Sequence, residues 1–229
     1  MNIFYQREKY NYDMTKYVEL PNYKDYVIEV DYSGITALIE NVKKNTGDEA
    51  SEYDDKFVEK HFDVSTVAEF EKNWAKSIAR KHFYNYLKTN IKIISFPEKE
   101  YKEKEQALVE SSNVFKTRFN MSFEEYLKNT MDMTISEYIK KQMKDEMTVV
   151  ALADKGGIKP TCEMVEKEKE KYIKDISKHY LEEHEFTVEE SMKRATADFE
   201  IQGGLYYVYE SLLYQQIDSK LIKYNKKST

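Results

Sequence analysis

Cysteine, proline and glycine are all scarce in this sequence. The single cysteine among 229 residues, Cys162, excludes an intramolecular disulfide and a cysteine-based metal site. Three prolines and six glycines leave long stretches without a helix breaker, and 34% of the residues are charged. This composition is typical of long solvated helices. We therefore expect an all-α protein of six or seven helices, with a short extended segment at residues 26–32.

Long apolar runs and basic stripes are also missing. No run approaches the roughly 20 apolar residues that a membrane-spanning helix needs, so we expect no membrane span. The net charge is −6, with 36 basic and 42 acidic residues interspersed, which argues against binding to nucleic acid. Residues 1–14 have no apolar core of the kind that a signal peptide contains. We expect a cytoplasmic protein; the alternative is an exported or lipid-anchored one whose leader precedes residue 1.

The residue types that usually form catalytic, metal or phosphate-binding sites do not have the spacing that such sites need. His179 and His184 are five residues apart, so on a helix they point in different directions and do not readily share a metal ion. The Gly-Gly pair at 156–157 lacks the downstream Lys-Ser/Thr of a phosphate-binding loop. Cys162 has no evident histidine partner. We therefore expect no metal, no cofactor and no enzymatic activity.

The same helix-start signal occurs twice in residues 120–138, NMSFEEYLKNTMDMTISEY. Ser122 with Glu125, and Thr134 with Glu137, have the spacing of a capping box, and each cap is worth about 1 kcal/mol. The pairs Met121–Tyr126 and Met133–Tyr138 have the spacing of a hydrophobic staple. The doubled signal predicts a short helix over residues 123–129 and a long helix from Ile135.

Other signals predict the remaining helices. One helix is expected over residues 34–45, one from the Thr66 cap to about residue 90, and others from caps at Thr161 and Thr187. Met164 stands where a capping box at Thr161 would have its glutamate, so the reciprocal hydrogen bond should be lost there. A further helix with Pro97 at its first position is polar nearly all round, which is typical of a projecting arm.

Five motifs follow one another in a characteristic order: Asp54-Asp55-Lys56-Phe57, Phe62-Asp63 with Thr66, Ser122 to Leu127, Met133 to Glu137, and Gly157-Ile158-Lys159-Pro160-Thr161. From Tyr53 to about Leu221 this series resembles the C-terminal, substrate-binding (SurA-like) domain of the bacterial chaperone trigger factor. The resemblance implies an elongated arm-and-cradle architecture. It divides the chain into an extended N-terminal arm with a short helix, residues 1–52, and a helical substrate-binding domain, residues 53–229.

Two departures from the family affect the expected function. Residues 20–24, Leu-Pro-Asn-Tyr-Lys, look like the family's segment between domains, and the family's proline-isomerase domain would follow them. Only residues 25–53 separate this segment from the Asp-Asp-x-Phe motif, which is too short for an isomerase fold. The ribosome-docking domain with its Gly-Phe-Arg signature is absent as well. We expect no isomerase activity and no direct docking to the ribosome.

The composition itself favours binding of unfolded chains. The sequence contains 20 tyrosines and nine methionines, side chains that adapt to irregular apolar partners. We expect an ATP-independent chaperone for unfolded or nascent polypeptides, with homodimerisation left open; the alternative is a helical scaffold that binds one dedicated partner. The candidate client contacts lie around the doubled cap, and three of them belong to the stapling pairs: Phe115, Phe119, Met121, Tyr126, Met131 and Met133.

Overall fold

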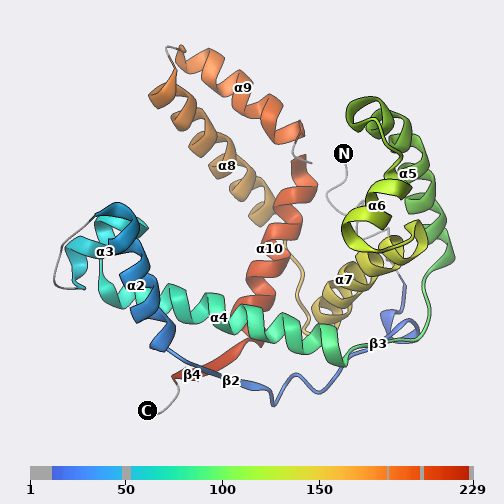
Figure 1. The fold of residues 1–229 in the computed structure, drawn as a ribbon, viewed down its shortest axis with the longest axis horizontal. Coiled ribbons are helices and arrows are strands. Elements are labelled where there is room, and N and C mark those ends of the chain that lie inside the picture. The colour runs from blue at the N-terminus through green and yellow to red at the C-terminus, as the bar shows by residue number, and fades with distance from the viewer. Residues whose placement is uncertain (1–11, 48–52, 185, 202–203, 227–229) are drawn as a thin grey trace. The chain divides into compact units, whose positions relative to one another are not determined.

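The chain is mainly helical and divides into two compact units (Figure 1). The computed structural model describes residues 12–47, 53–184, 186–201 and 204–226, and 75% of these residues are helical, which confirms the all-α prediction. Unit 1 comprises residues 1–20 and 91–220, and unit 2 comprises residues 21–90 and 221–229. The division predicted between residues 52 and 53 falls inside unit 2, so it does not separate these two units.

Unit 2, where the structure describes it, consists of three helices and a small parallel sheet. Its elements are β2 (Val27–Val30), α2 (Ser33–Thr46), α3 (Asp55–Phe62), α4 (Val67–Asn90) and β4 (Lys223–Lys226). β2 confirms the extended segment predicted at 26–32, and α2 confirms the helix predicted at 34–45. β4 lies parallel to β2, with Val27 opposite Lys223 and Val30 opposite Lys226. The core of the helices comprises Ile35, Ile39, Phe57, Val58 and Phe70.

Side-chain caps set the helix boundaries of unit 2. The Asp54 carboxylate accepts a hydrogen bond from the Phe57 N–H at 2.9 Å and starts α3, a helix that the sequence analysis did not assign. At the predicted Thr66 cap, the Glu69 N–H donates to the Thr66 hydroxyl at 3.1 Å, and α4 follows. Local hydrogen bonds therefore satisfy backbone groups that the helix itself leaves unpaired.

The described residues of unit 1 form six α-helices together with short extended pieces. Its elements are the 3₁₀ turn η1 (Met14–Lys16), β1 (Val18–Glu19), β3 (Lys92–Ile93), α5 (Glu98–Phe119), α6 (Phe123–Met131), α7 (Ile135–Lys155), α8 (Cys162–Glu183), α9 (Val188–Ile201) and α10 (Gly204–Leu221). β1 and β3 are antiparallel. Pro97 is the residue before α5 and not its first helical residue, so the predicted start is one residue early. The described part of the chain thus holds more helices than the six or seven expected.

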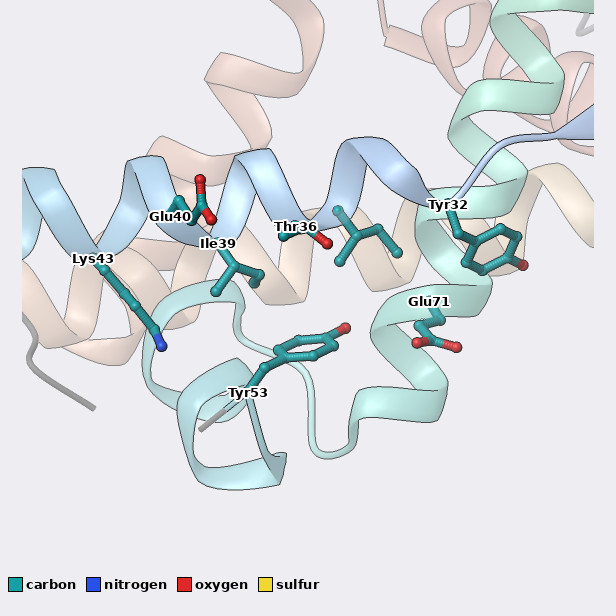
Figure 2. A pocket seen from close by; sticks show the side chains of 8 residues that line it. Tyr32, Thr36, Ile39, Glu40, Lys43, Tyr53 and Glu71 are labelled. Carbon is teal, nitrogen blue, oxygen red and sulfur yellow. The ribbon is translucent and has the colours of Figure 1, made fainter. Parts of the chain in front are cut away.

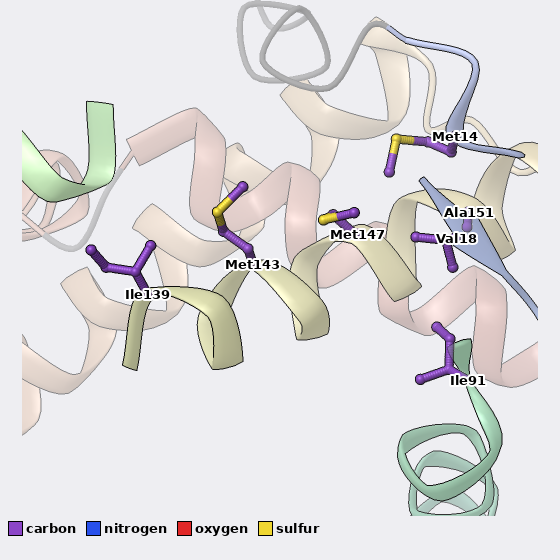
Figure 3. Packing of buried hydrophobic residues seen from close by; sticks show 7 residues of the cluster. All are labelled: Met14, Val18, Ile91, Ile139, Met143, Met147 and Ala151. Carbon is purple, nitrogen blue, oxygen red and sulfur yellow. The ribbon is translucent and has the colours of Figure 1, made fainter. Parts of the chain in front are cut away.

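The apolar stripe of α7 forms the centre of unit 1 (Figure 3). Ile139, Met143 and Met147 are fully buried, as their helical spacing predicts. They pack in one cluster with Met14 and Val18, which η1 and β1 supply from the start of the chain. Burial of each such side chain stabilises a fold by roughly 1.5–3 kcal/mol. Residues 14–18 are therefore part of the core of unit 1.

The polar helix α5 makes specific contacts with α7. The Tyr101 hydroxyl donates to the Ser136 hydroxyl at 3.0 Å, and the Lys104 ammonium lies 2.6 Å from the Glu146 carboxylate. Both charged side chains of this ion pair are largely shielded from solvent, with 15% and 30% of their surface exposed. The first turns of α5 are therefore held against α7 by polar groups, which explains how a helix with so few apolar residues packs there.

The predicted boundaries of α8 and α9 are also observed. The Met164 N–H donates to the Thr161 hydroxyl at 3.3 Å, and the reciprocal bond is absent because methionine replaces the glutamate of a capping box. At Thr187 both bonds with Glu190 form, at 2.9 and 3.2 Å. Gly157, with φ of +60°, adopts the left-handed conformation after α7 that glycine adopts without strain.

Glu210 of α10 generates a prediction about stability. Burial, followed by the charge of Glu146, raises the pKa of Glu210 above its usual range. Its ionisation therefore costs the folded state more than the unfolded state, and the cost grows as the pH rises through the folded pKa. Glu210→Gln should raise the melting temperature at pH 7, and this gain should vanish near pH 4, where the wild-type carboxyl is protonated. Thermal unfolding at both pH values measures it.

The control for this prediction is Glu170→Gln, since Glu170 is exposed on α8. That variant should match the wild type at both pH values. A Glu210→Gln variant less stable than the wild type at pH 7 would show that the ionised carboxylate stabilises unit 1.

Candidate functional site

The doubled cap holds three helices of unit 1 in a compact turn. We call residues 115–138, from the end of α5 to the start of α7, the α6 tip. The Glu125 N–H donates to the Ser122 hydroxyl at 3.1 Å, and the Ser122 N–H donates back to the Glu125 carboxylate at 2.7 Å. Thr134 and Glu137 form the same pair of bonds, at 3.2 and 2.8 Å. Both capping boxes predicted from the sequence are thus confirmed.

The chain reverses direction at both ends of α6. Asn120 ends α5 with φ of +53°, and Asp132 ends α6 with φ of +50°, a left-handed conformation that Asn and Asp tolerate better than most residues. Hydrogen bonds from the backbone N–H groups of Ser122 and Thr134 lower the pKa of Glu125 and of Glu137. Both glutamate carboxylates therefore stay ionised at neutral pH, where they stabilise the two helix starts.

An aromatic cluster joins the three helices of the α6 tip. The ring of Phe115 on α5 lies 5.4 Å from that of Phe123 and 5.2 Å from that of Tyr126, both on α6. Phe123 in turn lies 5.6 Å from Tyr138 of α7, ring centroid to ring centroid. Such pairs contribute about 0.5–1.5 kcal/mol each beyond the area that they bury. Phe123 was not among the residues singled out from the sequence, although it belongs to the first capped turn.

The six sequence-predicted contact residues fall into two groups. Phe115, Tyr126 and Met133 are half-buried, and the first two pack in the aromatic cluster. Phe119, Met131 and Met121 are exposed, with 51%, 44% and 36% of their surface accessible. Phe115 therefore joins α5 to α6, a role that its position in the sequence did not indicate. All three exposed side chains belong to the α6 tip, whose helix starts are capped.

The described residues contain neither a cluster of metal ligands nor a membrane-spanning helix. Nowhere in residues 12–47, 53–184, 186–201 and 204–226 do three or more His, Cys, Asp or Glu side chains gather as metal ligands. His179 lies 3.2 Å from Glu183, one helical turn away, and the ring of His184 packs against Phe186. Across the same residues, no helix combines the length and the apolar character that crossing a bilayer requires.

The chain was compared with known families, proteins and structures, and no relative was found. No protein-family model, no curated protein and no solved structure matches this chain. The likeness to trigger factor therefore rests on the five ordered motifs alone.

The aromatic cluster predicts that alanine substitutions at Phe115 and at Phe119 lower the free energy of unfolding by different amounts. Phe115→Ala should lower the free energy of unfolding by about 2 kcal/mol, because it removes half-buried area and two ring contacts to α6. Phe119→Ala should cost less than about 1 kcal/mol, since about half of that side chain is already in water. Urea titration followed by circular dichroism measures both. Equal costs would contradict the assignment of Phe115 as the residue that joins the helices.

Proposed function

We propose that this protein is an ATP-independent chaperone of the trigger factor type, which holds exposed apolar segments of unfolded or nascent polypeptides. The proposal includes the arm-and-cradle architecture that the motif resemblance implies, and it assigns the protein to the cytoplasm. It involves no covalent chemistry and no cofactor. The observation that carries it is the group of exposed apolar side chains on the α6 tip: Phe119, Met121 and Met131.

The chemistry of these side chains supports binding of varied partners. Methionine has three rotatable bonds and a polarisable sulfur, so one methionine fits differently shaped apolar groups. Phe119 adds a large apolar face next to the fixed ring of Phe115, at 4.5 Å. Two capping boxes and the aromatic cluster fix the backbone beneath them, so little backbone entropy is lost when a client binds.

The free energy that these three side chains can contribute indicates weak binding. Full burial of a large apolar side chain is worth roughly 1.5–3 kcal/mol, so covering the exposed part of three gives about 3 kcal/mol. A dissociation constant of 1 mM already requires about 4 kcal/mol. The α6 tip alone therefore holds a client only fleetingly, and useful retention needs a second contact on the same molecule.

The helical hairpin α8–α9 offers such a contact. Leu181, near the end of α8, and Val188 and Met192, in the first turns of α9, expose 40%, 66% and 43% of their surface. An extended client that touched both surfaces would gain from the high effective concentration of the second one. A small folded protein without exposed apolar segments would gain nothing, which is the selectivity that a chaperone needs.

The α6 tip predicts a loss of chaperone activity without a loss of stability. The double variant Phe119→Ser, Met131→Ser removes about 2 kcal/mol of apolar contact with clients. The concentration that half-suppresses aggregation of a denatured test protein should therefore rise about tenfold or more. Light scattering during dilution from denaturant measures this, and the melting temperature should stay nearly unchanged.

A matched control exists elsewhere on the chain. Val27 and Ile94 expose 45% and 53% of their surface, close to the values for Met131 and Phe119. The double variant Val27→Ser, Ile94→Ser should suppress aggregation as well as the wild type does. If both double variants lose activity equally, the α6 tip has no special role. If the wild type protects one partner and no other denatured protein, the scaffold alternative replaces the chaperone.

The chain should also lack proline-isomerase activity. The segment between Asp25 and Tyr53 contains β2 and α2, and it offers too few residues for a separate isomerase fold. In a protease-coupled assay with a proline-containing peptide, the isomerisation rate should equal the uncatalysed rate. Turnover above that background would contradict the proposal that this protein acts by binding alone.

A further inference from the structure

Unit 2 contains a cavity between α2, α4 and Tyr53, which lies two residues before α3. Its volume is about 350 Å³, enough for a small organic molecule (Figure 2). α2 supplies most of the lining, Tyr32 stands just before that helix, and Glu71 comes from α4. The lining includes Tyr32, Ile35, Ile39, Lys43, Tyr53 and Glu71.

The floor of the cavity is aliphatic. Ile35 and Ile39, one turn apart on α2, are almost fully buried and belong to the core of unit 2. Because they are fixed by that core, they present a preformed apolar surface of about one helical turn. A chain of methylene groups would be favourably covered there, at roughly 0.8 kcal/mol for each buried CH₂.

One end of the cavity carries polar groups without partners. The Tyr53 hydroxyl is buried, and no described residue forms a hydrogen bond with it. In Figure 2 this hydroxyl points to the side on which Glu71 lies. Within the described residues, the Glu71 carboxylate forms neither an ion pair nor a hydrogen bond. A buried hydroxyl without a partner costs about 1–3 kcal/mol, so a ligand that engages it recovers that energy.

The two phenols at this end remain protonated. Burial, followed by the charge of Glu71, raises the pKa of Tyr53 to about 12, and the same two causes raise the pKa of Tyr32. At neutral pH the negative charge there therefore belongs to Glu71, beside two neutral phenol rings. A carboxylate next to aromatic rings is a favourable setting for an ammonium group, which can also donate a hydrogen bond to a phenol oxygen.

The opposite end of the cavity is positively charged. Lys43 lies at the far side of Tyr53 from Glu71 in Figure 2, with its ammonium 5.5 Å from the ring centroid of Phe57. Among the described residues no carboxylate pairs with it. Glu40 also lines the cavity, but its carboxylate is exposed and points away from Tyr53. The cavity therefore has a carboxylate at one end, a lysine at the other and an aliphatic floor between them.

We propose that this cavity binds a small zwitterion whose ammonium and carboxylate are separated by an aliphatic chain, that is, an ω-amino acid. The ammonium lies against Glu71 and the Tyr53 hydroxyl, the methylene groups cover Ile35 and Ile39, and the carboxylate faces Lys43. This site is independent of the chaperone proposal, because all of its residues belong to unit 2 and the α6 tip belongs to unit 1.

The test uses 6-aminohexanoate as the probe and Trp74 as the reporter. Trp74 is the single tryptophan of the chain and packs against the same core as Ile35 and Ile39, so its emission responds to a ligand on that floor. Titration of the full chain should give a saturable change. Hexanoate, which lacks the ammonium, and hexylamine, which lacks the carboxylate, should each bind at least about tenfold more weakly, since each loses a hydrogen bond to a charged group.

Variants then separate the two ends of the site. Glu71→Gln should weaken 6-aminohexanoate about tenfold or more, and Tyr53→Phe several-fold. Lys43→Met should weaken 6-aminohexanoate but leave hexylamine unchanged. The control Glu59→Gln, exposed on α3, should bind 6-aminohexanoate as the wild type does.

Three outcomes would overturn the proposal. The first is the absence of saturable binding of 6-aminohexanoate in a wild type whose circular dichroism shows it to be folded. The second is equal affinity of the wild type and Glu71→Gln. The third is equal binding of hexylamine and 6-aminohexanoate, which would remove the carboxylate end of the site. If a variant fails to fold, the comparison of the three probes on the wild type still decides between these results.

Discussion

The buried stripe of α7 is the interaction on which unit 1 depends. Ile139, Met143 and Met147 are completely buried and contact residues from three separate segments of the chain. The same helix carries Glu146, which binds Lys104 of α5, and begins after the Thr134 cap, which belongs to the α6 tip. The exposed side chains of the tip are therefore positioned by a helix that the core holds along one face.

Elements whose causes are local could be predicted from the sequence. The capping boxes at Ser122, Thr134 and Thr187 each involve residues three apart, so their hydrogen bonds can be inferred from spacing alone. The loss of the reciprocal bond at Thr161 followed from Met164 in the same way. The polar character of α5 is evident from the sequence, but its contacts with α7 depend on single pairs such as Lys104 and Glu146, which no periodicity reveals.

Features that depend on distant residues could not be predicted. β2 was expected as an extended segment, yet its partner β4 lies almost two hundred residues later, and nothing in the sequence of either strand specifies a parallel register. The position of Phe115 between α5 and α6 depends on how two helices meet, so the sequence could not separate it from the exposed Phe119. The cavity of unit 2 was missed for the same reason, since its ends come from α2 and α4.

Site-specific photocrosslinking tests most directly whether the α6 tip touches unfolded clients. A benzophenone amino acid in place of Phe119 should capture a denatured test protein in the full chain and should not capture the same protein in its native state. The same group in place of Val27, a similarly exposed position in unit 2, should capture neither. Crosslinks of equal yield from both positions, or none from position 119, would contradict the account.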